Sequence, residues 1–587
     1  MRPTGDGALD AALGRVSALR RLQRSAPTTG EGLVARALGD RERLRTALRS
    51  EGYWGGVPVV TLAGEPPETP GLAARLEGRP EPVAAVVGAE PGARYAIGSV
   101  EIAPEVPEAD ITEAGEVTGL DPGDPARAGA VIAAGERLLE RMREAGRPFA
   151  AVARRDVVVD HDARTMEVSY VLAPGPRATF APPVVEGATR VDPRLLRAVA
   201  GQLDGRRYSP TQLDRVRRDL LALGVFGTAR ARAAERLDAA GRLPVTFLVA
   251  ERPFRALGVT AAFETAYGPT VRTYWEHRNL FGAAERLRIE GEVGRVGAAG
   301  GGGRGGGSLS SANARLSAEL RQPWIGGRNV TLVSSVAALR ERLRAYDRDA
   351  VTASVAVETQ PDPRLTLGLG VLADVGRVRE SDEEGFRDAQ VAGFLGTARW
   401  DGTDNVLDPA RGLRGNALVS PLYALSASTV FTRVRLGGSA YFDLDGERGS
   451  VLALRAVVGS IPGGSVRDTP PQYRFYAGGG GSVRGYDFQR IGPRRPDGTP
   501  RGGLSLVEGS VELRQRVSGA WGVAVFADAG TVGTDEAPSV ERVRVGAGLG
   551  VRYATAIGPI RADVAVPLVR ERDSSAFGLY VGIGQAF

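Results

Sequence analysis

Apolar and polar residues alternate with a period of two over long stretches of the chain, from about Arg255 to the C-terminus. In residues 430–445, apolar side chains recur on one face of an extended strand, and charged or polar side chains recur on the other. These stretches run about 10 to 15 residues, whereas strands of soluble sheets usually have about 5 or 6. A strand that crosses a bilayer needs about 9 to 11 residues, apolar toward lipid and polar toward the lumen, and closure satisfies every backbone amide. Length therefore favours a transmembrane β-barrel over a soluble sheet.

The number of alternating stretches predicts the size of this barrel. About eleven can be placed before Tyr473 and five after Leu504, which gives about sixteen antiparallel strands, an even number as bacterial barrels favour. We expect the barrel to cover residues 254–587, with a long inward loop around 472–503. The glycine-rich run at 300–307 lacks the Gly-Lys-Ser/Thr ending of a phosphate-binding loop, so we expect a loop or turn between strands there.

Residues before about 253 show helical periodicity, interrupted by short β-rich runs. One sequence pattern occurs three times: a helix with apolar residues three or four apart ends at a glycine, and an aromatic residue then begins a strand. This self-similarity, with a period of about 80 to 90 residues, predicts tandem β-α-α-β-β modules rather than one irregular α/β domain. The first module is expected to lack its opening strand, because helix-like sequence begins at Ala8. The expected modules are residues 1–94, 95–175 and 176–253. The repeated sequence pattern lies at Gly52-Tyr53, Gly146 to Phe149 and Gly224 to Phe226.

The last strand of the predicted barrel has small residues on one face. Glycine on the lumen side weakens packing and strand pairing, so this strand is expected to close the barrel imperfectly. The alternative is a strand that glycine bends only for curvature. The outward face is predicted to hold Phe577, Leu579, Val581, Ile583 and Phe587, and the inward face Gly578, Tyr580, Gly582 and Gly584.

Composition excludes several classes of chemistry. The 587-residue chain has no cysteine and 2 histidines, which removes disulfide scaffolds, Cys/His zinc sites, thiol nucleophiles and nearly every His-based catalytic arrangement. The acidic run at 382–384 is predicted to be a solvated loop, and no nucleophile and base stand at a meaningful spacing. We therefore expect no enzyme, no cofactor and no metal.

The net charge of +6 comes entirely from arginine, since the sequence contains no lysine. The arginines are scattered rather than gathered on a stripe with aromatic residues, so we expect no nucleic-acid binding. No run approaches the roughly 18 to 20 apolar residues of a membrane helix. The start, Met1 to Asp6, lacks the basic segment, apolar run and cleavage site of a secretory signal. Either the protein is cytoplasmic or its natural start lies upstream, and a signal peptide is missing from this sequence.

Within the predicted loop, Arg474-Phe475-Tyr476-Ala477-Gly478-Gly479 is followed by Ser482-Val483-Arg484-Gly485-Tyr486. Supporting motifs are Asn279-Leu280-Phe281-Gly282 at an early hairpin, Leu407 to Gly412 before the ninth strand, Val525 to Gly530 on the thirteenth, and Gly558-Pro559-Ile560-Arg561 opening the fifteenth. In this combination and order, the chain resembles the BamA/TamA family of outer-membrane assembly proteins, whose soluble modules are called POTRA domains. Three POTRA-like modules are more similar to TamA-like members than to BamA, which usually carries more, or to two-partner exporters, which usually carry fewer.

The resemblance implies a role for the loop arginine. In the family this arginine pairs with an acid on the barrel wall, and here the matching position is Asp528, with inward Glu512 as a second candidate. From the residues alone, a solvated loop arginine is the alternative. The implied lumen motif is Val483, Arg484, Gly485 and Tyr486.

The resemblance also implies function and location. The barrel would lie in the bacterial outer membrane and the modules in the periplasm, and a seam between the first strand (about 256–267) and the last (577–587) would open sideways to insert autotransporter-like clients. Expected partners are unfolded outer-membrane proteins, outer-membrane lipid and a TamB-like periplasmic or inner-membrane protein. A two-partner-type polypeptide exporter would share the architecture, whereas a passive porin would have no reason for three modules.

Overall fold

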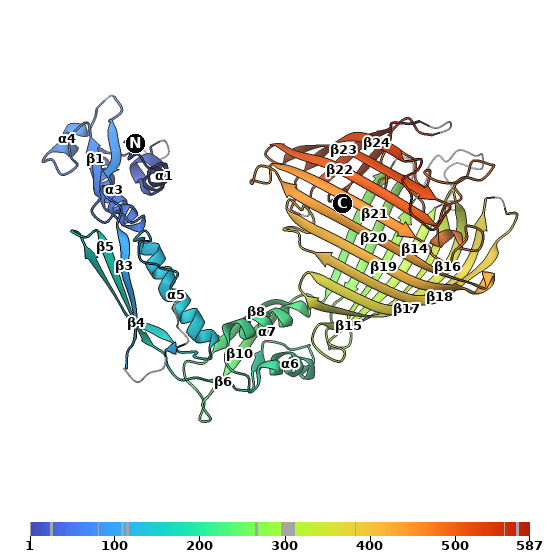
Figure 1. The fold of residues 1–587 in the computed structure, drawn as a ribbon, viewed down its shortest axis with the longest axis horizontal. Coiled ribbons are helices and arrows are strands. Elements are labelled where there is room, and N and C mark those ends of the chain that lie inside the picture. Colours follow the sequence, from blue (N-terminus) through green and yellow to red (C-terminus); the bar gives the residue numbers. More distant parts are fainter. Residues whose placement is uncertain are drawn as a thin grey trace. The chain divides into compact units, whose positions relative to one another are not determined.

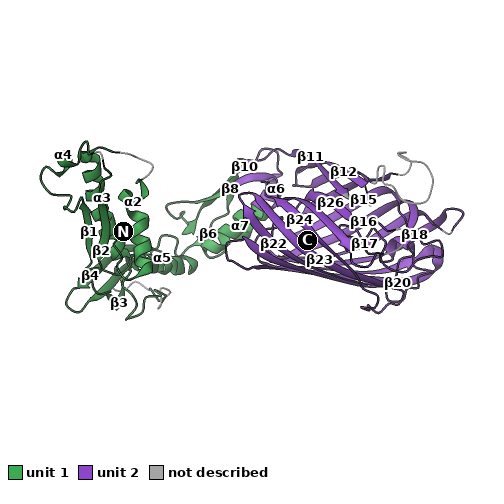
Figure 2. Cartoon of the chain, turned by 90° about the horizontal axis from the view of Figure 1, so that it is seen from above, with its two compact units in different colours: residues 1–187, 197–220, 229–249 green, residues 188–196, 221–228, 250–587 purple. Residues whose placement is uncertain are grey.

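The structure is a computed structural model, and it describes residues 2–23, 28–79, 81–106, 111–112, 117–264, 268–294, 312–381, 383–556, 558–570 and 574–587. The chain divides into two compact units, one of residues 1–187, 197–220 and 229–249 and the other of residues 188–196, 221–228 and 250–587 (Figure 2). None of the helices in the described ranges is both long and apolar enough to cross a membrane.

Sixteen antiparallel strands close into a barrel in the C-terminal part, each paired with its neighbour in sequence (Figure 1). Eleven strands precede the long loop and five follow it, so the predicted class and strand number are confirmed. The strands are β11 (Arg255–Glu264), β12 (Gly268–His277), β13 (Arg286–Gly294), β14 (Asn313–Pro323), β15 (Val330–Arg342), β16 (Tyr346–Asp362), β17 (Leu365–Glu380), β18 (Arg387–Asp401), β19 (Gly412–Ala424), β20 (Thr429–Asp443), β21 (Ser450–Ser460), β22 (Ser505–Ser518), β23 (Trp521–Gly533), β24 (Arg544–Tyr553), β25 (Ile560–Pro567) and β26 (Gly578–Ile583).

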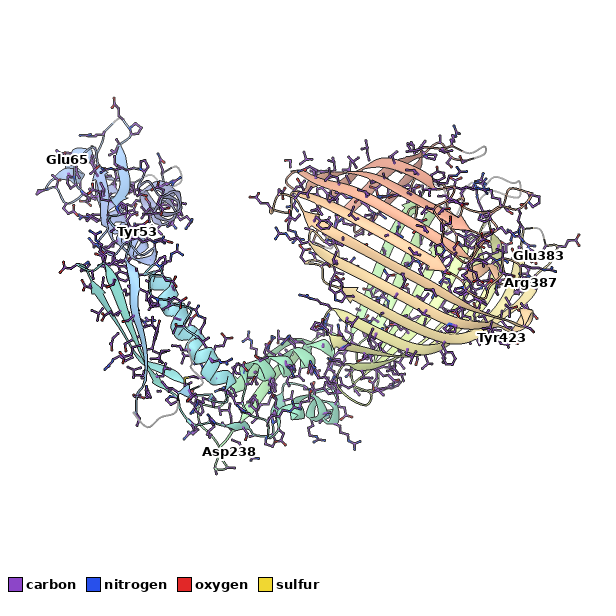
Figure 3. All side chains as sticks on the ribbon, viewed as in Figure 1. Tyr53, Glu65, Asp238, Glu383, Arg387 and Tyr423 are labelled. Atoms are coloured by element: carbon purple, nitrogen blue, oxygen red, sulfur yellow. The ribbon has the colours of Figure 1, made fainter. Side chains whose placement is uncertain are left out.

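The two faces of the barrel wall differ as the alternation predicts, and side chains project from both (Figure 3). On β20, Leu436 and Phe442 are 50% and 47% exposed on the outer face, whereas Tyr441 between them is 2% exposed on the inner face. Outward apolar side chains are the surface that a bilayer covers. The predicted glycine-rich loop at 300–307 lies outside the described residues.

The first and last strands close the barrel. In the described residues, β11 pairs with β26 at Phe263 with Val581 and at Glu264 with Tyr580. Strand β26 pairs with β25 along the whole stretch from Ile560 to Ala565. Residues 265–267 lie outside the described residues, so the expected imperfect closure stays a prediction.

Within residues 2–106, a layer of helices packs on a two-stranded sheet. Helix α3 packs its apolar face, which includes Leu44 and Leu48, against the antiparallel pair of β1 and β2. In the described residues, α1 comes before the first strand, β1, and the Arg2 amide donates to the Val87 carbonyl over 2.9 Å beside β2. The elements are α1 (Gly7–Val16), α2 (Ala18–Arg21), α3 (Gly30–Ser50), β1 (Val57–Leu62), α4 (Leu72–Leu76), β2 (Ala85–Glu90) and β3 (Ala96–Pro104), the last of which begins the next sheet.

The next sheet has the order β3-β5-β4, with β3 parallel to β5, and α5 (Ala128–Glu144) packs on it. Strands β4 (Ala151–Asp160) and β5 (Thr165–Ala173) form an antiparallel hairpin. The described residues hold one of the two helices expected here, and residues 107–110 and 113–116 lie outside them.

Residues 179–251 show the predicted β-α-α-β-β order in full. Three strands form a sheet of order β7-β10-β8, two helices lie between β7 and β8 in the chain, and β6 pairs with β9. The elements are β6 (Thr179–Phe180), β7 (Val184–Glu186), α6 (Pro193–Ala200), α7 (Pro210–Ala222), β8 (Phe226–Ala233), β9 (Arg242–Leu243) and β10 (Val245–Glu251). The three module boundaries stay predictions, because the two compact units divide residues 176–253 between them.

The three glycines predicted to end helices have the expected backbone conformation. Gly52, Gly146 and Gly224 have φ of +94°, +99° and +75°. This left-handed conformation suits glycine and ends a helix.

A loop at 188–192 contacts the first barrel hairpin, and both lie in the same compact unit. Asn279, from the early-hairpin motif, donates from Nδ2 to the Arg190 carbonyl over 2.8 Å, and the Asp192 amide donates to the Gly282 carbonyl over 2.8 Å. Glu251 fixes the other side of this loop, because its Oε1 accepts from the backbone amides of Thr189 and Arg190, each over 2.8 Å. Burial would raise the pKa of Glu251, but these hydrogen bonds and those from the two side chains lower the pKa to about 2.

We predict that Glu251→Gln loosens this loop. Hydrogen bonds to a charged acceptor contribute about 1.5 to 3 kcal/mol, so amide protection at Thr189 and Arg190 should fall about tenfold or more. Because the folded pKa is lowered, the stabilisation is present above the ordinary glutamate pKa near 4.5 and is lost as pH falls toward 2. Hydrogen exchange, normalised to unstructured peptides at each pH, measures both effects. The exposed acid Glu186 supplies the control Glu186→Gln, and equal protection in the two variants would contradict the assignment.

Candidate functional site: a loop held inside the barrel

The loop between β21 and β22, residues 461–504, fills part of the barrel interior. Its apolar side chains form one buried cluster with inward side chains of the wall, among them Phe431 and Val457. Isolated bridges join Phe475 to Gly503 and Ala477 to Ile491, so the loop also pairs with itself. The predicted inward loop around 472–503 is therefore a packed plug rather than a solvated excursion.

Each residue of the lumen motif meets a different part of the wall. Val483 is fully buried and lies where a side chain on Gly530 would collide with it, at 2.7 Å. Gly485 has φ of +96°, and a Cβ there would stand 2.7 Å from the Val566 backbone. The Tyr486 hydroxyl donates to the carbonyl of Val569 over 3.1 Å. Both the loop and the wall thus need glycine where their backbones approach closely.

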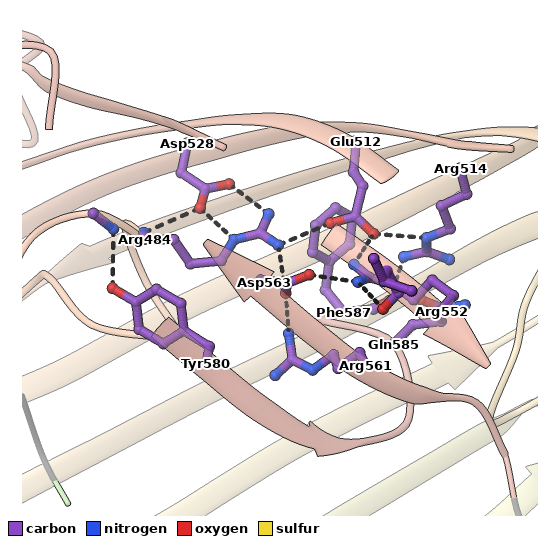
Figure 4. A network of polar contacts seen from close by, with 12 residues as sticks. Arg484, Glu512, Arg514, Asp528, Arg552, Arg561, Asp563, Tyr580, Gln585 and Phe587 are labelled. Atoms are coloured by element: carbon purple, nitrogen blue, oxygen red, sulfur yellow. Dashed lines mark hydrogen bonds and ion pairs between the residues drawn. The ribbon is translucent and has the colours of Figure 1, made fainter. Parts of the chain in front are cut away.

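Arg484 is the polar centre of this contact (Figure 4). Its side chain is 2% exposed, and it donates to Asp528 from Nε over 2.7 Å and from Nη2 over 3.0 Å, in a bidentate bond. Nη1 donates to Glu512 over 2.9 Å and to Asp563 over 3.3 Å. The guanidinium also lies 3.4 Å from the ring centroid of Phe526. The structure thus brings Arg484 together with both wall acids that the sequence singled out.

The same carboxylates bind further inward arginines. Glu512 accepts from Arg514 over 2.9 Å and from Arg552 over 3.2 Å, while Asp563 pairs with Arg552 and, over 3.2 Å, with Arg561. Four guanidiniums and three carboxylates from β22 to β25 and the loop therefore form one network, here called the lumen network: Arg484, Arg514, Arg552, Arg561, Glu512, Asp528 and Asp563. Removing one partner of a buried pair typically costs about 3 to 5 kcal/mol, because the other charge is left buried and unpaired.

Sequence reasoning missed Asp563, although the alternation of β25 already placed it on the inner face beside Arg561. Its distance from Arg484 depends on the register between strands, which one sequence does not reveal. Tyr580 was also placed on the inner face without a role. Its hydroxyl accepts from the Gly485 amide over 2.9 Å, so β26 touches the loop backbone directly. A Cβ on Gly578 would stand 2.3 Å from that hydroxyl, which gives this seam glycine a steric purpose.

The position of Phe587 at the chain end differs from the expected one. Phe577, Val581 and Ile583 face outward and Gly578 and Gly582 belong to the inner face, as predicted, but Phe587 does not follow the pattern. The strand ends at Ile583, and Gly584 has φ of +91°, so the last residues leave the strand direction. Arg514 donates to the Phe587 carbonyl over 3.2 Å and lies 5.6 Å from its ring centroid, on the inner side of the wall.

A second anchor holds the base of the loop on the other side of the barrel. Arg474, the first residue of the loop motif, donates to both oxygens of Glu380 on β17, over 2.9 and 3.0 Å. The neighbouring Tyr473 hydroxyl donates to Asp374 over 3.0 Å, and Arg348 pairs with the same carboxylate over 2.6 Å. Both anchors join an arginine of the loop to acids of the wall, so the loop is held at two distant strands.

This architecture is that of an integral β-barrel membrane protein with a loop anchored in its lumen. The Omp85 superfamily domain matches residues 279–587, which is more than half of the chain. The chain therefore belongs to the Omp85 superfamily. The predicted relationship to the BamA/TamA family is confirmed, and the TamA-like assignment within it stays a prediction.

Similar proteins carry the same architecture. The outer membrane protein assembly factor BamA of Neorickettsia risticii (strain Illinois) is 24% identical over 520 residues, which cover 84% of this chain and 66% of that protein. The chain thus spans slightly less than two thirds of that relative. Crystallised BamA from Haemophilus ducreyi lacking POTRA domains 1–3 has a TM-score of 0.67 at 18% identity and covers 83% of this chain and 100% of that chain. CdiB from Acinetobacter baumannii has a TM-score of 0.51 at 12% identity, with 84% and 90% covered.

We predict that Arg484→Ala releases the loop from the wall. The change leaves three buried carboxylates with fewer cations, a cost of about 3 to 5 kcal/mol. Amide exchange across residues 475–491 should rise at least about tenfold in the folded barrel. Arg484→Lys should rise nearly as much, because an ammonium cannot form the bidentate bond. Arg467 is an exposed arginine of the same loop, so Arg467→Ala is the matched control. Wild-type exchange in both Arg484 variants would show that the lumen network does not hold the loop.

Proposed function

We propose that this protein inserts unfolded β-barrel proteins into the bacterial outer membrane through the seam between β11 and β26. The observation that carries the proposal is that, among the described residues, β11 and β26 pair at two positions, whereas β25 and β26 pair at six. An open strand edge presents unpaired backbone groups, and an incoming strand can satisfy them by adding to the sheet. In a bilayer this exchange is strongly favoured, because lipid offers no hydrogen bonds.

The relatives support the same proposal, since the outer membrane protein assembly factor BamA aligns with 84% of this chain at 24% identity. The barrel would lie in the outer membrane and the N-terminal modules in the periplasm, where they would receive unfolded clients. We propose strand pairing rather than bond chemistry as the activity. Autotransporter-like clients and a TamB-like partner remain part of the proposal.

The second candidate is a two-partner-type polypeptide exporter. That function needs an open pore, so the loop would have to leave the lumen, where the apolar cluster and both arginine anchors now hold it. Insertion through the seam leaves the loop in place. The packed lumen therefore favours the assembly function.

We predict that locking the seam abolishes activity. Phe263 and Val581 face each other across the seam and are both outward, and the chain has no cysteine of its own. A disulfide between Phe263→Cys and Val581→Cys suits directly opposed residues of antiparallel strands. Full-length protein in liposomes should accelerate protease-protected insertion of an unfolded autotransporter barrel over empty liposomes, and the oxidised variant should lose this acceleration until reductant is added.

The control disulfide joins Val419→Cys and Val434→Cys, which oppose each other between β19 and β20, away from the seam. This variant should remain active when oxidised. Full activity of the locked seam variant would exclude lateral insertion. Acceleration that appears only with a TamB-like protein added would make that partner obligatory, and export of a client into the lumen of the liposome would favour the second candidate.

A further inference from the structure

The outer face of the barrel carries a broad groove across strands β12 to β18. Its volume is about 980 Å³, and its floor is made of short and apolar side chains. Outward residues of the floor include Val271, Ala314, Leu316, Ala338 and Val351. Large side chains would fill this space, so the groove exists because alanine and glycine occupy several of these positions. It faces the side of the wall that a bilayer covers.

One end of this groove is charged. Arg340, Asp349, Arg377 and Asp388 lie opposite one another on β15, β16, β17 and β18 and line the groove. They stand near the 343–345 turn, at the end of the barrel that Glu383 and Arg387 mark in Figure 3. Strand β11 begins at the opposite end of the barrel. The groove therefore runs from an apolar floor to a polar rim, which is the profile of an amphiphile.

The charges at this rim are not evenly matched. Asp349 is shared by three guanidiniums, those of Arg342 at 2.7 Å, Arg377 at 3.1 Å and Arg340 at 3.5 Å. With Arg379, which pairs with Asp347 over 2.6 Å, the outer face of these four strands holds four arginines against three aspartates. The side chains of Arg340 and Arg377 stay 54% and 61% exposed.

An aromatic ring completes the rim. The guanidiniums of Arg377 and Arg379 lie 4.9 and 5.0 Å from the ring centroid of Phe386. Aromatic rings and arginines gather where a barrel meets lipid headgroups. Guanidiniums bind phosphate by paired hydrogen bonds, which a shared carboxylate leaves available.

We propose that this groove is a binding site for a phosphate-bearing membrane lipid, whose acyl chain lies on the apolar floor and whose phosphate binds Arg340 and Arg377. The inference rests on the proposed placement of the barrel in a membrane, and it is independent of the seam. The groove would hold the lipid of the leaflet at the end distant from the start of β11.

Two lipids that differ only in phosphate test the site: dioleoylphosphatidic acid and dioleoylglycerol. Full-length protein is folded in detergent micelles, each lipid is added, and bound lipid is counted by native mass spectrometry. We expect the wild type to retain phosphatidic acid with at least about tenfold greater occupancy than dioleoylglycerol. Excess inorganic phosphate should not displace it, because the acyl chains contribute to binding.

The variant Arg340→Gln/Arg377→Gln should lower phosphatidic acid occupancy about tenfold. The matched control is Arg399→Gln/Arg411→Gln, which removes the same charge. Those arginines have side chains 60% and 58% exposed and pair with Glu358 and Asp443 away from the groove. Ala338→Phe keeps the rim but fills the floor, and it should also lower occupancy. Heat-modifiable migration in gels shows that each barrel is folded.

Several outcomes would overturn the proposal. Equal binding of the two lipids, equal loss in the control variant, or full retention by both groove variants would remove the phosphate site. Displacement by inorganic phosphate would show a free-anion site. A dimer mass that Ala338→Phe abolishes would show that a second copy of the chain covers the groove. Loss of seam-dependent insertion with normal lipid binding would instead count against the proposed function alone.

Discussion

The interior of the barrel depends on one buried guanidinium. Arg484 reaches the lumen on a loop and meets carboxylates from three different strands, Glu512, Asp528 and Asp563. A charge this far from solvent is stable only when paired and hydrogen-bonded, and a bidentate bond together with two further acceptors meets that need. The other inward arginines then balance the acids that Arg484 shares. The loop and the wall are thus each electrostatically incomplete without the other.

The lumen network also reaches the seam. Tyr580 pairs across the seam with Glu264 through its backbone, while its hydroxyl accepts from the Gly485 amide of the loop. Past the end of β26, Arg552 donates to Gln585 over 3.0 Å and Arg514 donates to the Phe587 carbonyl. Strand β26 and the residues after it are therefore also held by side chains from inside the barrel.

Much of this was accessible from sequence, for identifiable reasons. A period of two fixes which face each residue occupies, so the strand number, the inward position of Glu512 and the outward apolar faces all followed from the pattern, whereas Asp528 was implied by the resemblance. The motif resemblance singled out Arg484. Distances across the lumen did not follow, because they depend on register and closure, and Asp563 was therefore missed. Phe587 was misplaced because a single left-handed glycine, Gly584, ends the alternation, and sequence does not distinguish such a glycine from an extended one.

The energies of the two contacts suggest an order of events. In the proposed function, opening the seam breaks the two residue pairs that the described residues form there, and each backbone hydrogen bond contributes about 0.5 to 1.5 kcal/mol when water or another strand replaces it. Without a replacement in lipid, each orphaned group costs several times more. Releasing the loop breaks Arg484 away from three carboxylates, and one such pair alone costs about 3 to 5 kcal/mol. A strand that arrives at the seam removes the first cost and does nothing about the second. In the proposed function, seam opening is therefore coupled to the client, whereas the loop stays in place as the support against which β26 moves.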